Sequence, residues 1–527
     1  MKTINNIKYT LSLALLFLTF SCNDVLVNED PNGVAIDQLP PEVILPGAFT
    51  VPSETFLSTM NGLGNTMIAT WSGNAQQVQA PYFEEFQYQL TTDFYDNIWD
   101  NLMARTGNLT QIITNEYPDN YDYFKGVSKI YRAFYFQYLV DLYGDIPFTD
   151  IHQRSDLLFP EYDDQVDVYI SLIEDINDAI AQIQNTDTST VVPLGSSDVI
   201  MNGNMTKWIK FGNTIKLRIL LRMSDVAQTN PELQTIFNTE FEALNNASFI
   251  NFGEDVTINP GYSDELDRMN PFVETFGYDP GAFGITGNQT FSNLRAGPTT
   301  YLVEFLNGTS NGVSDARLQR LYTTRSGQDD IQGNTQGGSE QPSRIGPGLL
   351  ISPQQDGYIM TASESLFLQS EAIFKGYLSS GNAKSLFESA ILSSFVRLGV
   401  DTDDFLPPPD DEDLDESTTP EIAASTYISN SNNVSGIGWD GTSNKLEAII
   451  TQKWIDLGGT NGIETWIEYT RTGFPSNMPL PDITNRPNRP IRLLYPTSEY
   501  TGNSANVGIY NQTVDTAFDN PIFWDVN

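Results

Sequence analysis

Cysteine and histidine are almost absent from this chain, whose 527 residues include one of each, Cys22 and His152. A single cysteine cannot form an intramolecular disulfide, and a Ser-His-Asp triad would have only His152 as its base. Zinc sites draw on several cysteine or histidine ligands, and the sequence has no D-x-[DN]-x-[DN]-G calcium loop. We therefore predict no catalytic residue, no cofactor and no metal, although a calcium ion held by scattered Asp and Asn oxygens stays open.

Basic residues are scarce as well, because 27 Lys and Arg stand against 67 Asp and Glu, which gives a formal net charge of −40. This charge would repel the phosphates of nucleic acid, so no nucleic-acid partner is expected. A sulfated or uronate-rich ligand would need a local basic pocket. Neutral sugars suit this charge better, and aromatic residues make up 12% of the chain, enough for a core and for surfaces on which sugars stack.

Long apolar runs are missing except near the N-terminus, where residues 11–20 follow Lys2 and Lys8. A membrane-spanning helix needs ~20 apolar residues, so this shorter run indicates a secretion signal. It ends directly before Ser21 and Cys22, and we expect cleavage there and acyl chains on Cys22 that anchor the protein in the outer membrane, exposed on the cell surface. The bulky residue before Ser21 departs from a strict lipobox, and an ordinary signal peptide is the alternative.

Three segments follow from this reading of the chain. Residues 1–21 form the lipoprotein signal peptide, residues 22–40 the lipidated N-terminus and tether, and residues 41–527 a single helical domain with long loops. Acidic residues and Pro31 argue against a helix in the tether.

Apolar residues at helical spacing predict helices in the third segment. The expected ranges are 42–67, 121–143, 166–183, 205–224, 363–377, 383–398 and 445–469, the last with a break at Gly458 and Gly459. Ala383 and Ala390 lie seven residues apart, a spacing similar to that in the second helix of a tetratricopeptide repeat. Trp208, Trp454 and Trp466 fall on helical stripes and are expected in the core.

Long segments without helical periodicity separate these helices, at 251–293, 327–355 and 401–439. They are rich in Gly, Pro, Asn, Ser and Asp, which predicts loops with short strands or turns. Loops beyond ~15 residues are uncommon in a compact domain unless they are functional or disordered, so we expect a helical scaffold that positions binding loops. The acidic run at 407–416 is interpreted as a solvated excursion rather than a cation site.

Four stretches together resemble the SusD/RagB family of outer-membrane nutrient-binding lipoproteins, in its SusD-like branch. They are EDPN at 29–32 with PEVILPGA at 41–48, YLVDLYGDIPF at 138–148, KWIKFGNTIKLRILLRMS at 207–224 and RLLYPTSEYTGNSANV at 492–507. The resemblance implies a mostly α fold, in which tetratricopeptide-like helical pairs form a scaffold for a loop-rich, irregular ligand-binding half. It also implies a partner, a SusC-like TonB-dependent transporter over which the lipoprotein acts as a lid.

Sugar binding needs flat aromatic faces for the apolar side of the ring and amide or charged groups for its hydroxyls. The cluster at 71–99 combines aromatic and amide residues, and Trp71, Asn74 and Trp99 are its candidate ligand contacts. Trp439, in a glycine-rich loop, is a fourth candidate. Core packing is the alternative for the aromatic residues of the cluster, and anchoring of the loop is the alternative for Trp439.

We therefore predict a cell-surface lipoprotein that is not an enzyme, binds a glycan or oligosaccharide, and delivers it to a TonB-dependent transporter. A secreted glycoside hydrolase is one alternative, since it needs only two carboxylates separated by ~5 to ~10 Å. The residues offer Glu84-Glu85, Asp264-Glu265 and Glu464/Glu468 as arbitrary pairs. The string 308–312 fits G-x-S-x-G, but a turn follows it where a nucleophile elbow needs a helix. A repeat scaffold that binds only protein is the other alternative, and a peptide ligand also stays open.

Overall fold

Helices dominate the part of the chain that the structure describes, and the strands in it are short. This computed structural model describes residues 39–77, 80–153, 157–285, 288–400 and 419–526. The expected signal peptide at 1–21, Cys22, nearly all of the expected tether at 22–40 and the acidic run at 407–416 lie outside these residues. The contacts between residues divide the chain into two units, Met1–Pro40 and Pro41–Asn527. The second unit is described below.

Apolar residues at helical spacing produce the long helices, and α8 (Gln165–Asn185) illustrates how they do so. Asp164 caps its start, because the side chain accepts a hydrogen bond from the Val166 N–H. Its buried face packs against α7 (Asp122–Tyr143). That face consists of Val168, Tyr169, Leu172, Ile173, Ile176, Ala179 and Ile183.

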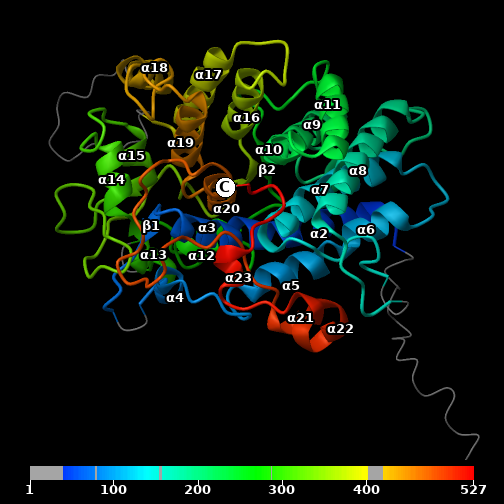
Figure 1. The fold of residues 1–527 in the computed structure, drawn as a ribbon, viewed down its shortest axis with the longest axis horizontal. Helices are drawn as coiled ribbons and strands as arrows, with labels where there is room; N and C mark the ends of the chain where they lie inside the picture. Colours follow the sequence, from blue (N-terminus) through cyan, green and yellow to red (C-terminus); the bar gives the residue numbers. More distant parts are fainter. Residues whose placement is uncertain (1–38, 78–79, 154–156, 286–287, 401–418, 527) are drawn as a thin grey trace, which may run out of the picture. The chain divides into compact units, whose positions relative to one another are not determined.

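Successive long helices lie beside one another as pairs. Helix α7 packs against α8, and α16 (Ala362–Phe374) packs against α17 (Ala383–Leu398). Helix α9 (Met205–Arg222) contacts both α8 and α11 (Pro231–Leu244), and the single-turn α10 (Ser224–Ala227) connects α9 to α11. Figure 1 shows α7, α8, α9 and α11 on one side of this unit. The expected mostly α fold with tetratricopeptide-like helix pairs is confirmed.

The first expected helix, at 42–67, is continuous but changes its winding. It consists of α2 (Pro41–Thr55), the π-helical segment η2 (Phe56–Met60) and α3 (Asn61–Met67). Its buried face carries Phe49 and Phe56, which contact Tyr131 and Phe134 of α7. A π-helical turn is rare and shifts the side chains that follow it, so η2 sets the orientation of α3.

Helix α3 lies against the end of the last expected helical region. That region, predicted at 445–469, is two helices, α19 (Lys445–Leu457) and α20 (Gly462–Thr472), separated at the expected glycine break. A Cβ on Gly64 of α3 would lie 2.0 Å from the backbone of Gly462, so only glycine allows this approach. The Asn61 side chain joins the two segments, because its Nδ2 donates to the Gly459 carbonyl at 2.8 Å and its Oδ1 accepts from the Gly462 N–H at 2.9 Å.

Within the described residues, the loop-rich part contains short helices and three two-stranded antiparallel pairings. Its helices are α12 (Pro271–Phe276), α13 (Phe291–Arg295), α14 (Thr300–Leu306) and α15 (Arg317–Leu321). The pairings join β1 (Trp71–Ser72) to β3 (Gly297–Pro298), β2 (Val256–Ile258) to β6 (Gly357–Met360), and β4 (Tyr322–Thr323) to β5 (Arg344–Ile345). Figure 1 shows α13, α14 and α15 together, on the side opposite α8 and α11.

Several helices were not expected from the sequence, and most of them are short. Within 401–439, where a loop was expected, residues 420–431 form α18; this expectation was wrong there, because Pro420 starts a helix and Ala423, Ala424 and Tyr427 bury one side of it. The expected loop at 251–293 likewise contains α12 and the start of α13, and α11, α14 and α15 were not expected either. The others are α4 (Phe83–Gln87), α5 (Asp96–Arg105), α6 (Gly107–Thr114), η4 (Gly195–Ser197), α21 (Thr497–Gly502), α22 (Ser504–Val507), η5 (Gly508–Tyr510) and α23 (Thr516–Asp519).

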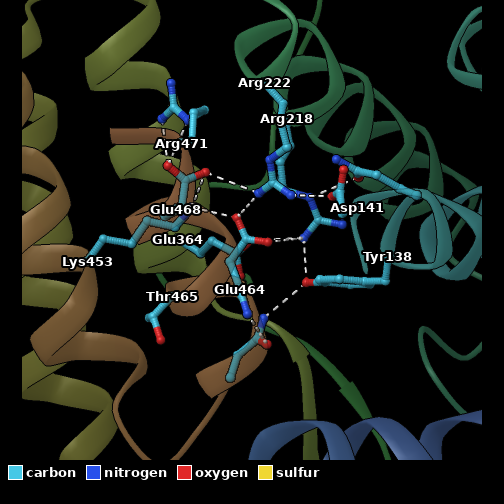
Figure 2. A network of polar contacts seen from close by, with 12 residues as sticks. Tyr138, Asp141, Arg218, Arg222, Glu364, Lys453, Glu464, Thr465, Glu468 and Arg471 are labelled. Atoms are coloured by element: carbon cyan, nitrogen blue, oxygen red, sulfur yellow. Dashed lines mark hydrogen bonds and ion pairs between the residues drawn. The ribbon is translucent and has the colours of Figure 1, made fainter. Parts of the chain in front are cut away.

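A buried network of charged side chains joins α7, α9, α16, α19 and α20 (Figure 2). Arg218 of α9 donates to Glu364 of α16 at 3.1 Å, and Arg222 donates to Glu464 at 2.6 Å and Glu468 at 3.1 Å, both on α20. Arg222 also pairs with Asp141 of α7.

The network continues through α19 and the end of α20. Lys453 donates to Glu464 at 2.8 Å, and Arg471 donates to Glu468 at 2.6 Å and to Glu371 of α16 at 2.8 Å. Burial alone would raise the pKa of Glu468, but Arg471, Lys453 and Arg222 together hold it well below its usual range. Ion pairs therefore form part of the buried interface between these helices, beside its apolar contacts.

None of the helices in the described part of the chain combines the length and the apolarity that crossing a membrane requires.

Candidate functional site

Trp71, the first candidate ligand contact, lies in β1 with 0% of its surface exposed. Its ring meets Phe276 at a centroid distance of 4.9 Å and Phe272 at 6.4 Å, both from α12. Neighbouring rings therefore cover the faces that a sugar would need. In this conformation Trp71 supports the residues around it, and direct contact with a ligand stays a prediction.

Trp99, on α5, is also buried, with 1% of its surface exposed. Its ring packs edge-on against Tyr143 at 4.9 Å and Tyr495 at 5.5 Å and is stacked on Tyr162 at 6.1 Å. Its indole N–H donates to Glu499 at 3.2 Å. The ring thus joins α5 to the C-terminal segment, as the core-packing alternative describes, and its contact with a ligand is likewise a prediction.

Asn74 and Trp439, the other two candidates, are both half-buried. The Asn74 side chain accepts a hydrogen bond from the Gln76 N–H at 2.9 Å, which shapes its own turn. Trp439 packs against Phe387 at 5.4 Å and Phe374 at 6.2 Å, with the Lys445 ammonium 5.8 Å from the ring centroid. The structure separates these two residues, since Trp439 lies by α16 and α17 and Asn74 lies by β1.

Trp208, Trp454 and Trp466 are buried on α9, α19 and α20, as their helical spacing predicts. The Trp208 indole N–H donates to Asp198 at 2.8 Å, and that of Trp466 donates to the Pro490 carbonyl at 2.9 Å. Their expected core role is confirmed.

A hollow of about 320 Å³ in the loop-rich part combines aromatic rings with hydroxyl and amide groups, and we call it the Tyr278 hollow. Its size is at the lower end of the ~300 to ~1,000 Å³ typical of small-molecule sites. The lining residues are Tyr278, Phe283, Gly284, Gln319, Tyr322, Thr323, Thr324, Ile345, Gly346, Pro347 and Leu350. Tyr278 and Phe283 are half-exposed with ring centroids 5.1 Å apart, whereas Gln319, Thr323 and Thr324 are exposed.

Backbone pairing holds the two aromatic rings at the rim of this hollow. Tyr278 follows α12 and forms an antiparallel bridge with Gln289. The Thr290 N–H donates to the Gly277 carbonyl at 3.0 Å, and Asn293 Nδ2 donates to the Phe276 carbonyl at 2.8 Å. The loop that carries Phe283 is therefore closed at its base and attached to α12.

The floor of the hollow is built by β4, β5 and the turn after them. The Gly346 N–H donates to the Leu321 carbonyl at 2.8 Å, and a Cβ on Gly346 would lie 2.6 Å from the Arg320 carbonyl oxygen. Glycine is thus required where the turn meets α15. Burial raises the pKa of Tyr322 above its usual range, and the Trp71 side chain partly opposes that rise.

Other hollows offer a poorer combination of groups for a sugar. One of about 490 Å³, beside His152, is lined by small, amide and hydroxyl residues of α5 and α6 without an aromatic ring besides the imidazole. Another of about 330 Å³ has Tyr262 but also Glu54, Asp267 and Glu274. A third, of about 340 Å³ between α11, α16 and α17, has Phe249 as its one aromatic lining residue. The Tyr278 hollow presents two aromatic rings at its rim beside uncharged polar groups.

The residues that the sequence offers for metal binding and for nucleophilic catalysis can be placed within the described ranges. No cluster of three His, Cys, Asp or Glu residues there is arranged to hold a metal ion. His152 is engaged with the Thr110 hydroxyl at 2.8 Å and the Met103 carbonyl at 2.5 Å. Ser310 of the G-x-S-x-G string follows helix α14 and is followed by turns and bends, which is not a nucleophile elbow.

The carboxylate pairs singled out from the sequence do not line the Tyr278 hollow. Glu464 and Glu468 belong to the buried network, where burial would raise their pKa but Arg222 and Lys453 among other cations lower it. A glycosidase acid needs the opposite, a raised pKa that keeps its proton near neutral pH.

The sequence analysis missed Tyr278, Phe283 and Tyr322, although it expected binding loops in this region. Tyr278 and Phe283 are aromatic residues in a segment without helical periodicity, which is the signal that singled out Trp439. The cluster at 71–99 was preferred because it has more tryptophan and amide residues. The structure shows that the rings of Trp71 and Trp99 are enclosed instead.

Comparison with known proteins places this architecture in one family. A family model described as starch-binding and associating with the outer membrane, SusD-like, matches residues 49–496. No curated protein matches the sequence.

Similar solved structures share the fold over nearly the whole chain. A chitin-binding protein is 22% identical, with a TM-score of 0.69, and the match covers 93% of this chain and 100% of that protein. A chitin-binding SusD homolog from Flavobacterium johnsoniae is 20% identical, with a TM-score of 0.69 and coverages of 92% and 99%. A SusD/RagB family protein from Bacteroides thetaiotaomicron is 18% identical, with a TM-score of 0.69 and coverages of 93% and 99%. With the family model spanning most of the chain, this protein belongs to the SusD-like family of outer-membrane-associated binding proteins.

Proposed function

We propose that this protein binds a glycan in the Tyr278 hollow at the cell surface and delivers it to a SusC-like TonB-dependent transporter, without hydrolysing it. The observation that carries the proposal is the pairing of Tyr278 and Phe283, half-exposed and 5.1 Å apart, with exposed polar side chains in one hollow. The family's description as starch-binding and the chitin-binding proteins that share the fold also support a glycan ligand.

The chemistry of the hollow fits a sugar ring. A pyranose has an apolar face that packs on an aromatic side chain and a rim of hydroxyls that need hydrogen-bond partners. Tyr278 and Phe283 provide the first, and Gln319, Thr323 and Thr324 provide amide and hydroxyl groups for the second. A Gln amide both donates and accepts, so it can match either role of a sugar hydroxyl.

The candidates from the sequence take different places in this proposal. Trp439 keeps part of its ring exposed, and we propose it as a separate stacking surface beside α16 and α17. We propose that the Asn74 side chain binds the glycan where it extends along the surface near β1. Trp71 and Trp99 are proposed to act from behind, by holding the segments that carry the exposed groups.

Affinity electrophoresis against a panel of neutral and acidic polysaccharides tests glycan binding directly. Retardation by a member of the panel is expected for the full chain. Tyr278→Ala and Phe283→Ala should weaken that retardation, while Phe252→Ala, which removes an exposed ring outside the hollow, should not. If all three substitutions changed the retardation equally, the glycan site would have to lie elsewhere than at Tyr278.

The same panel separates the two alternative functions. A reducing-sugar assay should detect no steady product from purified protein, and sustained release would favour the glycoside hydrolase. A scaffold that binds only protein would show no retardation by any polysaccharide. A peptide ligand is tested by competition, since a peptide that displaces the bound glycan would widen the ligand class.

Anchoring and delivery need experiments in cells. We expect Cys22→Ala to move the protein from the membrane to the soluble fraction, because the lipid on Cys22 is its proposed anchor. Protease added to intact cells should cleave the wild-type protein if it faces outward. Delivery predicts that the protein copurifies with a TonB-dependent barrel from detergent-solubilised outer membranes, and that loss of the barrel stops glycan uptake while surface binding persists.

A further inference from the structure

Two arginines beside the Tyr278 hollow form no ion pair with an acidic residue among the described ranges. Arg344 precedes Ile345 in β5 and lies opposite Thr323 of β4. Arg325 directly follows Thr323 and Thr324 in the sequence. Thr323, Thr324 and Ile345 line the hollow, and the two arginines are their neighbours in sequence without lining it themselves. Both side chains are half-buried.

The hydrogen bonds of the two arginines leave donors unused. Arg325 Nε donates to the Pro342 carbonyl at 2.5 Å, which holds the guanidinium against the backbone leading to Arg344. Arg325 Nη2 and Arg344 Nε are buried without a hydrogen-bond partner among the described residues. Within the described ranges neither arginine forms an ion pair, although acidic residues outnumber basic ones 67 to 27 in this chain.

The charges of the two arginines oppose each other. Burial and, to a smaller extent, the positive charge of Arg344 together lower the pKa of Arg325 to about 10. The fully buried Arg218, Arg222 and Arg471 are arranged differently, because each of them pairs with carboxylates of the protein. An anion bound between Arg325 and Arg344 would use the free donors and relieve their repulsion.

We propose that the glycan recognised by this protein is acidic, and that its carboxylate or sulfate group docks on Arg325 and Arg344 while a sugar ring packs on Tyr278 and Phe283. This inference rests on the proposed glycan-binding function and names the chemical class of its ligand. It gives the local basic site that an acidic ligand needs on a protein of net charge −40. The planar fork of arginine suits both anions, because two parallel N–H groups can bind two oxygens.

Matched polysaccharides separate the charge from the sugar. We would measure binding of the full chain by isothermal titration calorimetry to polygalacturonate and its carboxyl-reduced form, and to dextran sulfate and dextran. Tighter binding of an acidic member than of its neutral partner, by ~10-fold, is expected from charge-assisted hydrogen bonds. Preference in the first pair identifies a carboxylate, and preference in the second identifies a sulfate. That preference should weaken as salt is raised.

The double variant Arg325→Gln/Arg344→Gln should lose the preference for the acidic member and keep its affinity for the neutral one. Arg486→Gln is the matched control, because it removes a cation that pairs with the exposed Asp515. Thermal melting should show the double variant folded, since the substitutions remove two like charges. Two results would overturn the inference and leave the proposed function standing. The first is wild-type protein that binds the neutral polysaccharide as tightly as the acidic one. The second is a double variant that still prefers the acidic polysaccharide. No binding to either member of both pairs would count against the two proposals together.

Discussion

The two parts of this molecule treat buried charge in opposite ways. Where α7, α9, α16, α19 and α20 meet, Arg222 is shared by Asp141, Glu464 and Glu468. Beside the Tyr278 hollow, Arg325 and Arg344 form no ion pair with any carboxylate of the described residues. Removing a charge from water without an opposite charge beside it costs free energy, and the proposed acidic ligand would supply that opposite charge. The comparison thus distinguishes charges that hold the scaffold together from charges that are available for binding.

The largest effect is expected from breaking the paired charges. Arg222→Met would leave three carboxylates without their shared cation, and breaking a buried pair typically costs ~3 to 5 kcal/mol of unfolding free energy. Denaturant unfolding monitored by tryptophan fluorescence would measure it. Arg268→Met, which removes an exposed ion pair with Glu265, is the control and should change stability by less than ~0.5 kcal/mol. Equal effects would remove the distinction between network and surface.

A loss of similar size, ~3 to 5 kcal/mol, is expected for Trp71→Ala, because removing an enclosed ring from its contacts with Phe276 and Phe272 leaves a cavity. Trp439→Ala is the matched variant, with a half-exposed ring, and should cost less. Calorimetric melting of the two variants would measure the difference. An unchanged melting temperature for Trp71→Ala would instead favour an open ring available to ligand.

The loop-rich part should respond in affinity rather than stability. Tyr278→Ala removes one of two rings at the rim, and loss of an aromatic contact residue often costs ~2 kcal/mol, or ~30-fold in affinity. Titration calorimetry with the best ligand from the panel would measure it, with Phe252→Ala as the exposed aromatic control. A Tyr278→Ala protein that melts early but binds normally would assign the ring to the scaffold.

A smaller effect is expected in the pH dependence of stability. The cations around Glu468 hold its pKa well below the usual range despite burial. The stabilisation from its ionised form is therefore present above the unfolded pKa, ~4.3, and is lost as pH falls through that value toward the folded pKa. Glu468→Gln should flatten the dependence between pH 5 and pH 3 in urea unfolding. A steeper dependence in the variant would contradict this sign.

The sequence analysis predicted most helices whose buried faces are regular and missed short helices that depend on distant contacts. It also missed α11, although Leu233, Phe237, Phe241 and Leu244 form a regular buried face there. Residues 166–183 show an apolar stripe that the structure reproduces in α8. Short helices such as α4 and α13 have no such stripe, because neighbouring segments rather than their own periodicity hold them. Local periodicity therefore identified the scaffold but only the approximate place of the loops.

Trp71 shows why the site was harder to predict than the scaffold. Its aromatic and amide neighbours in sequence suggested an open binding surface, but the rings that enclose it are Phe272 and Phe276, two hundred residues away in the sequence. Composition near a residue cannot indicate which distant segment will cover it. The same limit hid Tyr278, which is held at the rim by pairing with Gln289.

The contact of Trp524 with the buried network bears on when this protein can fold. Its indole N–H donates to Asp141 at 2.9 Å across 383 positions of sequence, and the Phe523 N–H donates to Gln165 at 2.8 Å. Contacts of such long separation form late, because a large loop must close first. The polar centre therefore stays incomplete until the segment around Trp524 has joined α7, and during synthesis this part of the interior must wait for Trp524 to emerge.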